Sequence, residues 1–177
     1  MRCLYLLLIV ASNLITAKFN PIVIANGILI IPMGSLFAGA IFVLRDFVQI
    51  KHGKNKTYLT IFFAAVLSAL SSAIIGDTVH VALASIIAFF ISEAADTEIF
   101  SVIKNSLPVR VLLSGIIGGC LDSVIFVILG LSPIGANMLA WRLVPYAILG
   151  QMLTKAIVQI AALIYLIIFK NYKKEAE

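Results

Sequence analysis

Long apolar stretches with very few charges fill most of this sequence and decide what it can fold into. The clearest one covers residues 111–131, where Asp122 is the one charged side chain. A run of about 20 apolar residues can cross a bilayer as an α-helix. Hydrophobic residues make up 62% of the 177 positions and charged residues 12%, and the mean hydropathy is +1.14. Soluble domains are only about half apolar, so the sequence predicts an integral membrane protein.

The order of the apolar stretches predicts an all-α, polytopic protein with six transmembrane helices. No linker is long enough to divide the chain, so residues 1–177 are expected to form one membrane domain. The helices are expected at about residues 3–17, 27–44, 58–75, 79–103, 111–131 and 143–169. The second contains Pro32 and Gly34, and a proline removes a backbone donor. That helix is therefore expected to kink or to be reduced to a half-helix.

The basic residues predict how these helices are oriented. Lys and Arg concentrate in the cytoplasmic segments of membrane proteins. Residues 45–57 form the most basic connection, and residues 104–110 and the C-terminal tail are basic as well. The connections at 18–26, 76–78 and 132–142 hold one base, none and one. Both termini are therefore expected in the cytoplasm, and the net charge of +5 indicates topology rather than a nucleic-acid partner.

Three carboxylates at the end of the fourth apolar stretch are the strongest sign of function. Glu93, Asp96 and Glu98 follow the oily residues 79–90. An ionised carboxylate is costly inside a membrane. On a helix, Glu93 and Asp96 are neighbours at i,i+3 and share a face with Thr97, whereas Glu98 points elsewhere. A chain that keeps Glu93 and Asp96 in a membrane helix is expected to use them.

Further polar side chains fall within the predicted helices. Gln151, Lys155 and Gln159 are spaced i, i+4, i+8 and form one stripe, in which Lys155 is the expected counter-ion for Asp122 or Asp96. The pattern Asp-hydroxyl-x-Ile-Phe occurs at 96–100 and again at 122–126, which favours two helices that present these groups to a shared cavity. The expected substrate-binding residues are Asn13, Ser92, Glu93, Asp96, Asp122, Gln151 and Lys155. The alternative is that these charges only pair and hold the helices together.

Signals for other kinds of chemistry are missing from the sequence. It has no zinc-type ligand spacing, no phosphate-binding glycine loop and no hydrolase motif, so we expect no enzyme, no catalytic residue, no metal and no cofactor. No basic face carries interleaved aromatic residues, which argues against nucleic-acid binding. A metal site built from Glu93, Asp96, Asp122 and a histidine is not singled out by any spacing.

Four motifs carry a resemblance to a known family. They are residues 11–18 (ASNLITAK), residues 42–49 (FVLRDFVQ) followed by Gly53-Lys54, Ser92-x3-Asp96-x3-Phe100, and Asp122-Ser123-x2-Phe126. With these motifs, the chain resembles the queuosine-precursor transporter (VUT, vitamin uptake transporter) family over about residues 12–170. It looks like a divergent member, because residues 36–40 lack the acidic residue expected there. The resemblance implies six helices, both termini inside, and uptake of a 7-deazaguanine such as preQ0 or preQ1 across the inner membrane for tRNA modification.

The polar residues fit such a guest chemically. A carboxylate accepts two parallel N–H bonds from a guanine-like edge, and amides can meet its carbonyl and ring nitrogens. We therefore expect a transporter for a small heteroaromatic molecule in the lipid bilayer. The alternatives are a substrate-binding membrane subunit of a vitamin uptake system with an ATPase partner, and a non-transporting structural membrane protein. The exact substrate, the driving ion and the oligomeric state, a homo-oligomer among the options, stay open.

Overall fold

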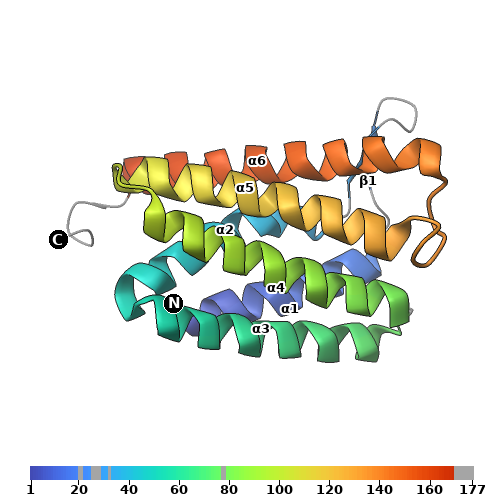
Figure 1. Cartoon of the computed structure of the whole chain (residues 1–177), viewed down its shortest axis with the longest axis horizontal. Helices are drawn as coiled ribbons and strands as arrows, with labels where there is room; N and C mark the ends of the chain where they lie inside the picture. Colours follow the sequence, from blue (N-terminus) through green and yellow to red (C-terminus); the bar gives the residue numbers. More distant parts are fainter. Residues whose placement is uncertain (20–21, 25–28, 32, 77–78, 170–177) are drawn as a thin grey trace.

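Six α-helices dominate the computed structural model, which describes residues 1–177 except 20–21, 25–28, 32, 77–78 and 170–177. They run side by side along the long axis of the molecule (Figure 1). Their bounds are α1 Arg2–Lys18, α2 Ser35–His52, α3 Lys54–Ile75, α4 Val79–Val102, α5 Leu107–Phe126 and α6 Val144–Phe169. A π-helical turn, η2 (Val127–Leu131), extends α5, and a 3-10 turn, η3 (Trp141–Leu143), precedes α6. The predicted order of helices is confirmed in this described part of the chain.

The all-α class is confirmed, but a short pair of β-strands takes the place of the beginning of the expected second helix. Strands β1 (Ile22–Ile24) and β2 (Leu29–Ile31) pair antiparallel, in the region where the second helix was expected to begin. β-Branched residues favour extended backbone. Helix α2 begins only at Ser35 and has 18 residues, so it is shifted along the chain and is not the half-helix that was expected, and Pro32 lies outside the described residues. Gly34 is held beside α1, because its N–H donates to the Thr16 hydroxyl over 3.0 Å and its carbonyl accepts from Ser12 over 3.0 Å.

The predicted basic loop at residues 45–57 is wrong, because these residues are helical on both sides of Gly53. Helix α2 continues through Arg45 to His52, and Gly53 alone separates it from α3. Gly53 has φ +79°, a conformation that side chains with a Cβ rarely adopt, so the tight turn between the helices falls at a glycine. Arg45 and Asp46 are consequently inside the bundle, with exposed fractions of 1% and 0%.

Four helical segments of the described chain are long and apolar enough to cross a membrane. They are Lys54–Ile75, Val79–Val102, Leu107–Leu131 and Trp141–Ile164. Large apolar side chains on their outer faces, such as Phe62 and Leu70, are more than half exposed. Exposed apolar surface on this scale is unusual for a soluble monomer and is what lipid contact requires. The fold is therefore that of a helical membrane protein.

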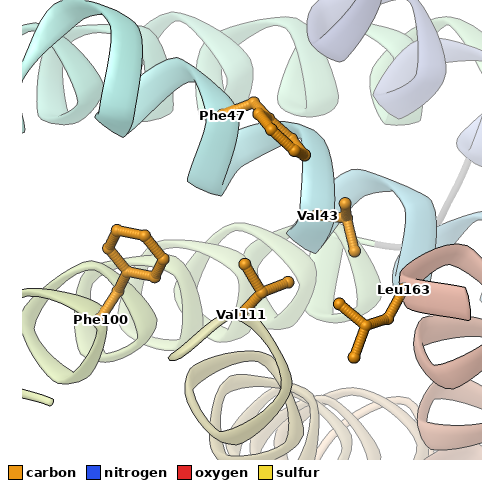
Figure 2. Close-up of a cluster of buried hydrophobic side chains, with 5 residues drawn as sticks. All are labelled: Val43, Phe47, Phe100, Val111 and Leu163. Atoms are coloured by element: carbon orange, nitrogen blue, oxygen red, sulfur yellow. The ribbon is translucent and has the colours of Figure 1, made fainter. Parts of the chain in front are cut away.

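The helices are held together by close backbone approach and by clusters of apolar side chains. One cluster consists of Val43, Phe47, Phe100, Val111 and Leu163, which come from α2, α4, α5 and α6 (Figure 2). At Gly39, helix α2 lies directly against the backbone of α6 at Val158 and Gln159. Small residues permit such close packing between membrane helices. These contacts fix the helices whose polar side chains build the site.

Candidate functional site

A cavity of about 230 Å³ lies between the helices. Six of the seven residues predicted to bind substrate line it: Asn13, Ser92, Glu93, Asp122, Gln151 and Lys155. Hydroxyl groups that the sequence did not single out add to its polar lining, namely those of Ser12, Thr16, Ser35, Ser68, Ser72 and Ser85. The rings of Phe42, Phe89 and Phe126 complete an aromatic part of the wall. The cavity therefore combines charge, hydrogen-bonding groups and flat apolar surface.

An ion pair between α6 and α5 lies on the cavity wall. The Lys155 ammonium donates to Asp122 Oδ2 over 2.5 Å, to Ser123 Oγ over 2.9 Å and to Gln151 Oε1 over 3.4 Å. The predicted pairing of Lys155 with Asp122 is confirmed. The Asp122 side chain is 24% exposed and that of Lys155 5%, so the carboxylate is the more accessible partner.

A second, fully buried cluster of charges surrounds Arg45. Its guanidinium lies 3.0 Å from Asp46 and 3.3 Å from Glu93, and it contacts Asp96 as well. All four side chains are at most 1% exposed. Removing charges from water in this way requires close pairing of opposite charges. We call these four residues the Arg45 cluster.

The sequence reasoning missed Arg45, Asp46 and Gln49 because it placed them in a cytoplasmic loop. The guanidinium also donates to Gln49 Oε1 over 3.0 Å and to Thr97 Oγ1 over 3.3 Å. A signal was present, because Arg45 and Gln49 are spaced i, i+4 in a stretch that is apolar apart from Asp46. That spacing puts both on one face of a helix, as in the stripe of Gln151 and Lys155.

Asp96 is the predicted site residue that the structure does not bring to the cavity. It is 0% exposed and pairs with Arg45, so its position supports helix pairing rather than direct contact with a guest. Glu93, one turn earlier on α4, belongs to both environments, since it lines the cavity and pairs with Arg45. Glu98 points elsewhere, as expected, and is 49% exposed in an ion pair with Lys54.

The repeated Asp-hydroxyl pattern has a structural meaning, though not the one expected. Asp96 and Thr97 together hold Arg45, and Asp122 and Ser123 together hold Lys155. Of the two aspartates, only Asp122 lines the cavity, so the pattern marks two cation sites instead of one shared cavity.

Two further amides hold helices in place. The Asn13 amide nitrogen donates to Ser68 Oγ over 2.9 Å and to Ser71 Oγ over 2.7 Å, which ties α1 to α3. Gln159 donates to the backbone carbonyl of Val111 over 2.7 Å and does not line the cavity. Within the described residues, no group of three His, Cys, Asp or Glu side chains is arranged to hold a metal ion.

The fold and the cavity define a class: a helical membrane protein with a small charged chamber between its helices. A family model described as "Putative vitamin uptake transporter" matches residues 71–169, more than half of the chain, so the chain belongs to this family. The family expected from the sequence is thereby confirmed. The matched region holds Ser92, Glu93, Asp122, Gln151 and Lys155, whereas Asn13 and Arg45 precede it. No curated protein and no solved structure matches the chain.

Proposed function

We propose that this protein takes up a queuosine precursor, a 7-deazaguanine such as preQ0 or preQ1, across the inner membrane. The observation that carries the proposal is the charged cavity inside a member of a vitamin uptake transporter family. Ionisable groups are rare within membrane helices. Where they occur, they face away from lipid and commonly mark a transport pathway or a binding site. Glu93, Asp122 and Lys155 line this cavity, so they are the groups assigned to the passenger.

The size and lining of the cavity support a small planar substrate. Its volume of about 230 Å³ is below the range of about 300–1,000 Å³ typical of drug-sized ligands. The rings of Phe42, Phe89 and Phe126 offer flat surfaces for stacking. The Glu93 and Asp122 carboxylates can accept N–H bonds from a guanine-like edge, while Gln151 and Lys155 meet its carbonyl and ring nitrogens. Asn13 and Ser92 complete the proposed substrate-binding residues. Asp96 does not contact the substrate in this proposal and instead holds Arg45 in place.

The topology assigned to this transporter has six crossings with both termini in the cytoplasm. In this assignment, α1 and α2 join the four segments that are long enough to cross on their own. The basic connections around Lys51–Lys56 and Lys104–Arg110 then face the cytoplasm, in agreement with the positive-inside rule.

Exchange of labelled preQ1 in liposomes that contain only the purified chain tests the proposal. Labelled preQ1 outside is expected to exchange with unlabelled preQ1 inside the liposomes without any ATPase. Guanine should compete better than adenine, because the edge of guanine presents two adjacent N–H donors. Asp122→Asn should abolish the exchange, whereas Glu98→Gln, a matched change at an exposed ion pair, should leave it intact. Exchange no higher than in empty liposomes would reject a stand-alone transporter for this substrate. Activity restored by an added ATPase would favour the subunit alternative.

A further inference from the structure

Glu93 connects the cavity to the Arg45 cluster. It lines the cavity wall, and its Oε2 lies 3.3 Å from the Arg45 guanidinium. The other two carboxylates of the cluster, Asp46 and Asp96, do not line the cavity and are 0% exposed. Of the four residues of the Arg45 cluster, Glu93 is therefore the one placed to exchange a proton with the cavity.

Negative charges outnumber positive ones around Glu93. Glu93 interacts with Arg45 and Asp46 on α2, Tyr5 on α1 and Asp122 on α5. In the next layer, Arg110 on α5 interacts with Asp46, and Lys155 on α6 pairs with Asp122. The buried residues of α3 are all uncharged. Four carboxylates, those of Asp46, Glu93, Asp96 and Asp122, thus face three cations. If all were ionised, the described residues of this region would carry one surplus negative charge.

Two carboxylate oxygens in the cluster have neither a hydrogen bond nor an ion-pair contact among the described residues. Asp46 Oδ2 and Asp96 Oδ1 are buried and accept no hydrogen bond from any described residue. Buried ionised carboxylates are costly unless their acceptor positions are filled. One proton would remove the surplus charge and would supply an O–H donor to a neighbouring oxygen. The surplus charge and the unfilled hydrogen-bond acceptors are therefore both explained by one bound proton.

We propose that the Arg45 cluster holds one exchangeable proton, that Glu93 passes it to and from the cavity, and that it crosses the membrane together with the substrate. This inference rests on the proposed function. In the loading step a proton from cavity water adds to a carboxylate oxygen of Glu93 and gives a neutral carboxyl group. In the release step that O–H bond breaks and the proton returns to water on the other side, so one proton accompanies each substrate. Neutral Glu93 no longer repels Asp122, and its O–H can donate to an acceptor on the guest.

Infrared spectroscopy tests the proton without any substrate. The purified protein at neutral pH is expected to show the carbonyl band of a buried protonated carboxyl group, shifted in D₂O. Glu93→Gln should weaken or remove this band, and Glu98→Gln, five residues further along the same helix, should not. A wild-type spectrum without the band, or a band unchanged in Glu93→Gln, would overturn the proposal.

Liposome transport separates this proposal from the proposed function. With labelled preQ1, a pH gradient that is acidic outside should drive accumulation of the label inside the liposomes. A protonophore should abolish this accumulation, and Glu93→Gln should not respond to the gradient. If exchange at equal pH occurs but the gradient has no effect, proton coupling is rejected and the proposed function stands. If neither occurs, both are rejected. Residual exchange by Glu93→Gln with the wild-type pH profile would also contradict a role for this carboxyl group in coupling.

Discussion

Arg45 contacts three carboxylates, on α2 and α4, that have almost no access to water. Lys155 is held in a similar way between α6 and α5, by the Asp122 carboxylate and the Ser123 hydroxyl. The two cations differ in access, since Lys155 lines the cavity and Arg45 does not. Arg45 therefore serves the stability of the bundle first, while Lys155 is placed to meet a guest.

Arg45→Gln should destabilise the protein strongly. The substitution leaves the carboxylates of Asp46, Glu93 and Asp96 buried without their cation, and removing one partner of a buried ion pair costs about 3–5 kcal/mol. The melting temperature in detergent, read from the loss of the monodisperse peak on heating, measures the effect. Arg142→Gln, at an exposed arginine, is the control and should melt like the wild type. An unchanged melting temperature in Arg45→Gln would show that the cluster does not hold the helices together.

The Lys155–Asp122 pair allows a test between binding and simple helix pairing. Lys155→Met alone should lower preQ1 exchange about tenfold or more, because a hydrogen bond to a charged group contributes about 1.5–3 kcal/mol. Lys155→Met alone leaves the Asp122 carboxylate without its partner, so this variant should also be less stable. The double variant Lys155→Met/Asp122→Asn removes both charges and should regain stability, while exchange stays low. Recovery of exchange in the double variant would mean that the pair only holds α5 against α6.

At the scale of elements, the six helices were predictable because each one needs a long apolar stretch. The hairpin β1–β2 and the true start of α2 were not, because short apolar runs fit strand and helix equally well. The second helix was also expected to end at Leu44, before Arg45, since a charged residue commonly marks the edge of a membrane segment. Its burial depends on Glu93 and Asp96, which lie about fifty positions later in the chain, and local sequence patterns do not reveal such partners.

Gly39 sets the distance between α2 and α6. A Cβ at this position would lie 2.7 Å from the Val158 carbonyl carbon and 2.9 Å from Gln159 Cα, which are backbone atoms that cannot turn aside. Gly39→Ala should therefore destabilise the protein by about 1–3 kcal/mol, as overpacking commonly does. In Gly119→Ala the nearest atom would be 3.5 Å away, an ordinary contact, and this matched control should keep wild-type stability. Equal melting temperatures for the two variants would argue against close packing at Gly39.

For the whole molecule, the site was more predictable than its internal organisation. Polar groups on membrane helices avoid lipid, so Asn13, Glu93, Asp122 and Lys155 were expected to meet, and they do line one cavity. The division into an open chamber and a closed cluster was not predictable, because Asp96 and Glu93 share a helix face and both pair with Arg45, yet Glu93 also lines the cavity and Asp96 does not.

The sidedness of the membrane helices can be tested with single cysteines placed in the connections. In a background without Cys3 and Cys120, a cysteine at Met138, between α5 and α6, should react with an impermeant maleimide in intact cells. A cysteine at Lys104, between α4 and α5, should react only after the membrane is opened, because the positive-inside rule places its basic connection in the cytoplasm. A cysteine at Lys56, in the first turn of α3, tests the end of the bundle where α2 meets α3 and should behave like the one at Lys104. Labelling of Lys104 and Met138 from the same side would mean that α5 does not cross the bilayer, and the cavity beside it would then lack one wall of a transport path.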